Sequence, residues 1–271
     1  MSAAGAAYLA FLAARDGEAD LPRHRLAHRE ELFDRLARDP VRSAAPLDRE
    51  AYLRNLVRRR PEAGLDERIL WLLATAKANQ AERFGVGLSE LYGRITPSDA
   101  ARVHIALQEF YHTRILADVV AIFGLPVGTQ PPPLVARMIV KTIIGTPEAW
   151  HLPLTGSAEM AGCIIFRALR DRGVELFADE PAVAGRIRVL FDEILGDEIG
   201  HVGFIAAQLG PVRRPIMRGL YRVLGFGMAA QMRELVAVIG RRELKRRFRA
   251  PFRLEAMAAE LPGLAFAAAP R

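Results

Sequence analysis

Two acid–histidine pairs lie inside otherwise apolar stretches of the sequence, and their residue types and spacing could do chemistry. Glu198 and His201 are three residues apart, so on a helix they project from the same face. Glu109 and His112 repeat this spacing. A carboxylate and an imidazole within an apolar stripe are costly to bury unless they are paired or bound to a cation. Either pair alone could be an ordinary helical ion pair, so a metal site requires further ligands.

Lone glutamates at matching depth complete a candidate metal site. A four-helix di-iron centre takes one glutamate from each of two helices and a Glu-x-x-His pair from each of the other two. Antiparallel helices joined by a turn are level at equal distances from that turn. If the first turn centres near Ile95, Glu109 lies about 14 residues after it and Glu82 about 13 before it. The loop between the next two helices similarly has Glu198 about 20 residues after its centre and Glu159 about 19 before it.

The chemistry of these residue types is consistent with two metal ions. Carboxylates and imidazoles are ligands that suit iron and manganese, and four carboxylates neutralise the charge of two divalent ions. Asp197, beside Glu198, is the kind of acid that orients a ligating histidine through its other ring nitrogen, and we expect it to reach across to His112. The matching position beside Glu109 is Gln108, so this supporting layer is expected to be asymmetric.

This ligand pattern resembles the ferritin-like di-iron carboxylate superfamily, particularly its oxygen-activating members, over residues 65–210. The metal ligands that the resemblance implies are Glu82, Glu109, His112, Glu159, Glu198 and His201. The segment 197–202 also looks like the corresponding helix of the p-aminobenzoate N-oxygenase family. That family has a further histidine four residues before the glutamate, where this chain has Ile194, so a seventh ligand is missing.

Helical periodicity dominates the sequence and predicts an all-α fold. The resemblance implies a ferritin-like four-helix bundle over 65–210, with an N-terminal helical extension over 1–64 and C-terminal helices and a tail over 211–271. Thr96 is predicted to cap the second long helix. The prolines in 146–153 are expected to interrupt or kink the third. The helices expected from residue 65 onward are 65–92, 96–123, 134–144, 155–170, 181–210, 215–240 and 241–249.

Composition narrows the class of protein and its surroundings. The 271 residues are 51% hydrophobic and 25% charged, which is typical of a globular protein with a sizeable core. Cys163 is the single cysteine, so no disulfide within the chain is expected. The apolar N-terminus lacks a basic segment typical of a signal peptide, and no stretch reaches the roughly 18 apolar residues of a membrane span. We therefore expect a soluble, cytoplasmic protein.

The resemblance implies a non-haem di-iron, O2-dependent oxygenase or hydroxylase. Its substrate would be a small organic molecule oxidised at a C–H bond, an aldehyde or an amine. Small residues on the third long helix, Gly156, Ala158, Gly162 and Cys163, are expected to leave room for it. The cofactors would be two Fe ions, with Fe/Mn or Mn left open, and O2 would be the co-substrate. An electron-donor protein or reductant would be required, and a homodimer is left open.

Two alternatives remain at this stage. The net charge of +7 and the basic segment 241–249, with Phe248 and Phe252 interleaved, would suit a tRNA-modifying di-iron hydroxylase. Packing of this segment on the bundle is favoured over nucleic-acid binding. The other alternative is a non-catalytic iron-binding or peroxide-detoxifying ferritin-like protein. A rubrerythrin-like module would need Cys-x-x-Cys pairs, which a chain with one cysteine cannot supply.

Overall fold

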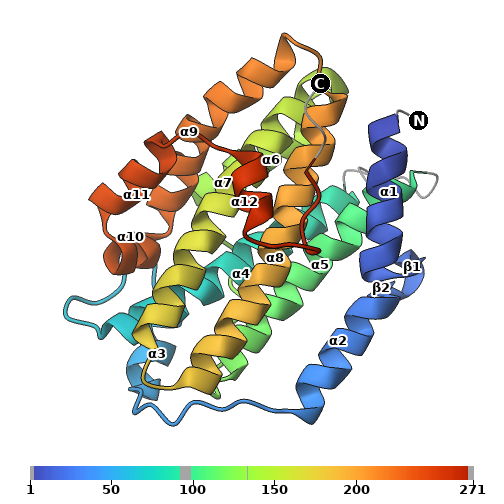
Figure 1. Cartoon of the computed structure of the whole chain (residues 1–271). Coiled ribbons are helices and arrows are strands. Elements are labelled where there is room, and N and C mark those ends of the chain that lie inside the picture. The colour runs from blue at the N-terminus through green and yellow to red at the C-terminus, as the bar shows by residue number, and fades with distance from the viewer. Residues whose placement is uncertain (1–2, 92–98, 133, 268–271) are drawn as a thin grey trace.

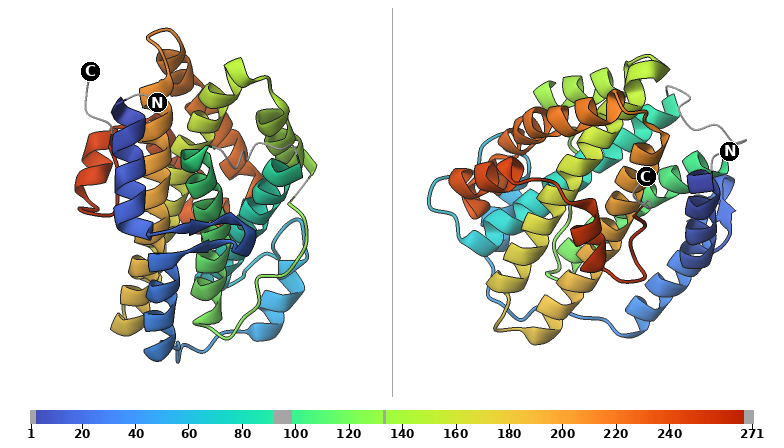
Figure 2. Two further views of the ribbon diagram at one scale, coloured as in Figure 1. Left: turned by 90° about the vertical axis from the view of Figure 1, so that its right-hand side faces the viewer. Right: turned by 45° about the horizontal axis from the view of Figure 1, so that its top comes forward.

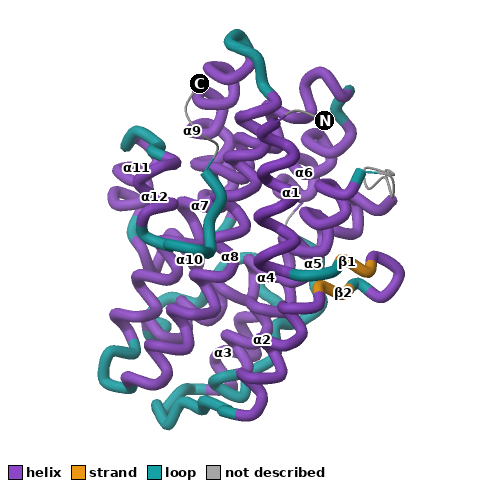
Figure 3. Tube along the Cα trace, turned by 45° about the vertical axis from the view of Figure 1, so that its right-hand side comes forward, coloured by secondary structure: helices purple, strands orange, loops and turns teal. Residues whose placement is uncertain are grey.

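The computed structural model describes residues 3–91, 99–132 and 134–267, and this part of the chain is built almost wholly from helices (Figure 1). The predicted all-α class is confirmed. Within the described residues, the strands are limited to β1 (Ala19–Asp20) and β2 (Arg25–Leu26), which pair antiparallel in a short hairpin (Figure 3). None of the described helices combines the length and the apolarity needed to cross a bilayer.

Four long helices form the centre of the molecule: α4 (Glu67–Leu91), α5 (Ala100–Ala121), α7 (Glu148–Leu176) and α8 (Pro181–Gln208). Helix α7 packs along α8, α5 packs against both α4 and α8, and α4 also contacts α7 (Figure 1). Their facing sides form one buried apolar core, in which Trp71 is the largest fully buried side chain. This core surrounds the polar cluster described below.

Local sequence signals explain where two of these helices begin. Asp99 caps α5, because its side chain accepts a hydrogen bond from the backbone N–H of Arg102. Thr96, the predicted cap, lies outside the described residues. Helix α8 begins with Pro181 at its first position, where the absent N–H costs no hydrogen bond.

The expected interruption over 146–153 is wrong in its extent. The chain leaves helical geometry at Thr146 and Pro147, but α7 then continues through Pro153. Pro153 lies in the second turn of α7, so the helix loses one hydrogen bond near its free end and keeps the long run that follows. The carbonyl of Pro153 accepts a hydrogen bond from the Ser157 hydroxyl, 2.7 Å away.

The expected single helix over 215–240 is also wrong, because the structure divides it into α9 (Arg213–Gln231) and α10 (Arg233–Ile239). The division lies at Met232. It turns α10 against α4, where the buried carboxylate of Glu234 lies 2.6 Å from the Lys77 ammonium. The local pattern of apolar residues gives no information about an ion pair between distant segments.

The remaining helices surround this core (Figures 1 and 2). Helix α1 contacts α5 and α8, the hairpin contacts α5, α3 packs on α4, and α6 lies across α4, α7 and α9. A short 3-10 helix spans Leu21–Arg23 within the hairpin. The remaining helices are α1 (Ala3–Asp16), α2 (Ala27–Arg38), α3 (Arg49–Leu56), α6 (Leu134–Gly145), α11 (Arg241–Arg249) and α12 (Leu254–Ala259).

Candidate metal centre

The four long helices bring the predicted ligands together in the interior of the molecule. Helix α4 contributes Glu82, α5 contributes Glu109 and His112, α7 contributes Glu159, and α8 contributes Glu198 and His201. Two groups of ligand atoms could each hold a metal ion. The first group comes from Glu82, Glu109 and His112, and the second from Glu109, Glu159 and His201, with the atoms of each group within 4.8 Å of one another. Glu109 belongs to both groups, so its carboxylate lies between them.

The sixth residue, Glu198, lies beside these groups, and its Oε1 is 3.6 Å from His112 Nδ1. Its other oxygen occupies the space next to Gly162, where an added Cβ would lie 2.6 Å from Oε2. Gly162, which was expected to make room for a substrate, therefore makes room for a carboxylate of the candidate centre. The space beside Gly156 is filled by the side chains of Met217 and Ile205.

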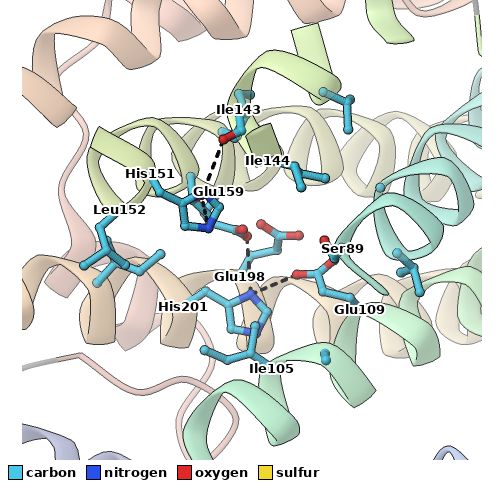
Figure 4. A pocket seen from close by; sticks show the side chains of 18 of the residues that line it. Ser89, Ile105, Glu109, Ile143, Ile144, His151, Leu152, Glu159, Glu198 and His201 are labelled. Atoms are coloured by element: carbon cyan, nitrogen blue, oxygen red, sulfur yellow. Dashed lines mark hydrogen bonds and ion pairs between the residues drawn. The ribbon is translucent and has the colours of Figure 1, made fainter. Parts of the chain in front are cut away.

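Both histidines contact a residue outside the two ligand groups through the same ring nitrogen, Nε2. His112 Nε2 lies 3.1 Å from Asp197 Oδ2, and His201 Nε2 lies 2.9 Å from Gln108 Oε1. An ionised carboxylate only accepts hydrogen bonds, so the proton of this pair belongs to His112 Nε2. The Nδ1 atoms consequently face the glutamates, where His201 Nδ1 lies 3.1 Å from Glu109 Oε1 and 3.3 Å from Glu159 Oε2 (Figure 4).

The orientation of the Gln108 amide is fixed by a residue outside the four long helices. Asp16, at the end of α1, accepts a hydrogen bond of 2.7 Å from Gln108 Nε2. Because the carboxylate of Asp16 needs a donor, the amide oxygen of Gln108 must face His201. His201 Nε2 therefore carries a proton, and its Nδ1 is the nitrogen available to a metal ion.

A buried charge network from the N-terminal helices supports Asp197 in turn. Arg29 Nη2 lies 2.8 Å from Asp197 Oδ1, and Arg29 Nε lies 2.9 Å from Asp16 Oδ1. Arg15 Nη1 lies 2.6 Å from the same Oδ1 of Asp197, and both arginines also bind Glu193. The network connects α1 and α2 to both histidines, through Asp197 on one side and Gln108 on the other.

Sequence reasoning missed this network. The segment 1–60 shows no catalytic constellation, because its acids and arginines lie in mixed-charge patterns that are common on solvated helices. Arg29 is nevertheless fully enclosed, and Asp16 is inaccessible to solvent. No fixed spacing relates Asp16 or Arg29 to Asp197, so only the fold reveals their meeting.

The surrounding carboxylates make both histidines strongly basic. Burial by itself would lower the pKa of His112, but Glu109 and Asp197 outweigh it and raise that pKa to about 9. Burial also opposes the charged form of His201, but the adjacent carboxylates of Glu109 and Glu159 outweigh it and raise the pKa of His201 to about 10. In the metal-free protein, we therefore expect both imidazoles to be protonated at neutral pH.

The pKa values of the buried carboxylates shift in opposite directions, according to the neighbours of each group. Burial raises the pKa of Glu82 and Glu198, and the nearby carboxylates raise both further. Burial also acts to raise the pKa of Glu109, but His112 and His201 hold it well below its usual range. Burial of Asp197 is likewise outweighed, because Arg15 and Arg29 keep its pKa low. The cluster has more acid than its own cations balance, which favours an added cation.

Unsatisfied polar atoms provide a direct test of whether this cage suits a metal. The buried atoms without a hydrogen-bond partner among the described residues include Glu109 Oε1, His112 Nδ1 and Glu198 Oε2. Glu109 Oε1 is close enough to His201 Nδ1 for an ion pair, but the angle does not suit a hydrogen bond. Leaving such atoms unpaired is costly, and all three are atoms of kinds that bind metal ions and belong to predicted ligands. The residues present therefore fit bound metal ions.

A cavity of about 290 Å³ opens onto the glutamate side of the cluster (Figure 4). Its walls are mainly aliphatic, with Ile143 and Ile144 from α6 and Leu152 and Ala158 from α7. His151 lines this cavity but turns its Nδ1 to the carbonyl of Ile143, 3.1 Å away, and it belongs to neither ligand group. The cavity also reaches Glu82, Glu109, Glu159, Glu198 and His201.

The basic C-terminal helix α11 packs on the molecule through its apolar residues. Phe248 is buried, and Phe252 is partly buried against the core. Arg246 pairs with Glu243 at 2.6 Å, and Arg247 pairs with Glu243 and with Asp171 of α7. The two aromatic rings considered for base stacking are therefore occupied by packing.

Comparisons with protein-family models, with curated proteins and with solved structures gave no match. Function is consequently inferred from the geometry of the cluster and the cavity.

Proposed function

We propose that this chain is a ferritin-like di-metal carboxylate enzyme that uses dioxygen to oxidise a small, largely apolar organic molecule. The observation that carries the proposal is the orientation of the two histidines. Each Nε2 is engaged from behind, and each Nδ1 faces a group of glutamate oxygens. A Glu and a Glu-x-x-His pair from each half of a helical bundle is the ligand set of di-iron carboxylate proteins.

The roles of the residues follow from their positions. Glu82 and His112 would hold one metal ion and Glu159 and His201 the other, while Glu109, which belongs to both groups, and Glu198 would supply the remaining carboxylates. Bound iron would supply the redox chemistry that reduces dioxygen. In a monooxygenase reaction, one oxygen atom enters the substrate. The other leaves as water, with two electrons from an external reductant and two protons.

The protein's own contribution is binding, orientation and exclusion of water. Asp197 and Gln108 fix the histidine rings, which keeps Nδ1 directed at the metals. The aliphatic walls supplied by Ile143, Ile144 and Leu152 would place an apolar substrate against the glutamates and keep water away from it. This cavity favours a substrate-oxidising enzyme over a protein that only stores iron or removes peroxide, because those functions require no organic pocket.

The test is metal content measured by mass spectrometry, after reconstitution with Fe(II) or Mn(II), on wild type and on Glu82→Ala and Glu198→Ala. Glu90→Ala is a matched control on α4, since Glu90 is half-exposed and pairs with His24 on the surface. We expect about two metal ions per chain in wild type and in the control, and loss of metal in the other two variants. After anaerobic reduction, the loaded protein should consume dioxygen. A wild-type chain that takes up neither metal would overturn the proposal.

A further inference from the structure

Helix α6 is apolar on two faces, although only one of them packs on the protein. Its inner face lines the cavity with Ile139, Val140, Ile143 and Ile144. Its outer face leaves Leu134 and Met138 62% and 60% exposed, with Val135 exposed between them. Large apolar side chains grouped on an exposed helix face mark an interaction site more often than chance exposure does.

The same part of the molecule is rich in cations and lacks acids. Helices α6 and α9 together carry six arginines and lysines and not one aspartate or glutamate: Arg137, Lys141, Arg213, Arg214, Arg218 and Arg222. Arg214 is occupied, because it donates to the carbonyls of Ala206 and Leu209 at the end of α8. Lys141, Arg213, Arg218 and Arg222 are exposed, and within the described residues they make no ion pair.

The two helices adjoin each other at one end of the molecule. Helix α6 contacts α9, and both lie at the end from which α7 descends into the core (Figures 1 and 2). Val212 and Val223 add exposed apolar side chains at and near α9. We define the α6–α9 surface as the exposed residues Leu134, Val135, Met138, Lys141, Arg218 and Arg222.

Helix α11 offers a contrast that identifies what this surface fits. It is the more basic helix, but both of its apolar residues, Leu244 and Phe248, are buried. Its Arg246 and Arg247 are already paired with Glu243. A surface that combines unpaired cations with exposed aliphatic side chains is suited to the boundary between anionic headgroups and acyl chains, whereas charge alone is not.

We propose that the α6–α9 surface docks this protein on an anionic lipid membrane. Each exposed lysine or arginine near such a surface contributes about 1 kcal/mol, and Leu134 and Met138 would insert below the headgroups. Helix α6 then separates the acyl region from the cavity, since its opposite face forms a cavity wall. A lipid-derived apolar molecule is the substrate class that this arrangement serves. That last step rests on the proposed function, whereas docking itself does not.

The experiment is co-sedimentation of the full chain with vesicles of phosphatidylcholine alone, or of phosphatidylcholine with about 30% phosphatidylglycerol. One variant, Leu134→Asp/Met138→Asp, removes the exposed apolar contacts. A second, Arg218→Glu/Arg222→Glu, reverses two unpaired charges. The control, Arg35→Glu/Arg38→Glu, makes the same change in net charge on exposed residues of α2, at the other end of the molecule (Figure 1).

We expect wild type and the control to bind the anionic vesicles, with weaker binding at high salt. Each of the two surface variants should bind at least about tenfold more weakly. Equal loss in the control would show that net charge alone acts and would overturn the proposal. A lack of vesicle binding by wild type would also overturn the proposal. It would do so even if the surface then proved to bind tRNA, or a second copy of the chain as detected by light scattering. Sedimentation is measured with or without metal, so a failed metal test leaves this result readable.

Discussion

The candidate metal centre has two sides of opposite character. On the histidine side, His112 and His201 back onto Asp197 and Gln108, and these contact a buried network of charges from α1 and α2. On the glutamate side, Glu82 and Glu159 face an apolar cavity lined by aliphatic side chains of α6 and α7. The same centre is thus fixed by polar contacts from one direction and left accessible from the other.

This difference indicates that the two sides of the centre have separate roles. Hydrogen bonds within the histidine side are short and mutually dependent, so that side can hold ligand atoms in place. The glutamate side instead borders an apolar cavity, so fewer polar contacts support it from that direction. Substitutions behind the histidines should therefore affect stability and metal affinity, whereas substitutions in the cavity wall should affect binding of apolar molecules.

Removal of the central arginine of the histidine side should have the largest effect. Arg29→Met leaves Asp16 and Asp197 buried with less compensating charge, and we expect it to cost about 3–5 kcal/mol of unfolding free energy. Arg167→Met is the control, because Arg167 pairs with Glu260 at the surface and should contribute about 0–1 kcal/mol. Urea unfolding of the metal-free proteins measures both. Equal effects of the two substitutions would show that the network is no more important than a surface pair.

Metal affinity should respond to the contact behind His112. Asp197→Asn removes the charge that holds the His112 proton on Nε2, and we expect affinity for Mn(II) to fall about 10–100-fold. Asp192→Asn is a matched change on the same helix, where the carboxylate pairs with Arg170 and touches no candidate ligand. Competition with a chelator measures the affinities. Unchanged affinity in Asp197→Asn would remove the role assigned to the histidine side.

The sequence could predict that these side chains meet, because helix geometry converts spacing into depth. Glu109 and His112 share a face at a separation of three residues, and packing of α4 along α5 brings Glu82 beside them. The same reasoning places Glu159 beside the pair on α8. These predictions depend only on helix pitch and antiparallel packing, which the four long helices follow.

The rest could not be predicted, because it depends on how separate segments meet. Arg29 meets Asp16 and Asp197 only after α1 packs on α8 and α2 packs on α1, and no local pattern encodes that packing. The division between α9 and α10 at Met232 accompanies an ion pair between Glu234 and Lys77 of α4, two residues that lie far apart in the sequence. The sequence of α6 predicts only a short helix and does not indicate that this helix forms a wall of the cavity.

Stability of the metal-free protein should fall as the pH rises. The folded-state pKa values of His112 and His201, about 9 and about 10, exceed the unfolded value of 6.5, so their contribution is complete below pH 6.5 and is lost as the pH rises through 9 and 10. Glu82 and Glu198 act in the same direction, since their pKa values are also raised.

We therefore expect the metal-free chain to lose about 1 kcal/mol or more of unfolding free energy between pH 6.5 and 9. Urea unfolding at the two pH values measures the change. In the double variant His112→Gln/His201→Gln, the decrease should be much smaller. Bound metal should remove it as well, because the metal replaces the protons. A metal-free wild type whose stability is constant over this range would contradict the assigned proton positions.

The smallest effect on stability and metal content should come from a substitution in the cavity wall. Ala158 lines the cavity from α7, and Ala158→Leu fills part of that space. We expect metal content to stay unchanged and unfolding free energy to change by no more than about 1 kcal/mol. Binding of an apolar probe should weaken, because the added carbons occupy the volume that the probe needs.

Hexan-1-ol and decan-1-ol are suitable probes, and the rise in the unfolding temperature that each produces in the metal-free protein measures binding. Ala37→Leu is the control, because Ala37 is exposed on α2 and lies outside the cavity. The alkanols should stabilise wild type and Ala37→Leu alike and stabilise Ala158→Leu less, with decan-1-ol affected more than hexan-1-ol. If Ala158→Leu retains the full response, apolar molecules bind elsewhere. That result would contradict the proposal that the substrate approaches from the glutamate side.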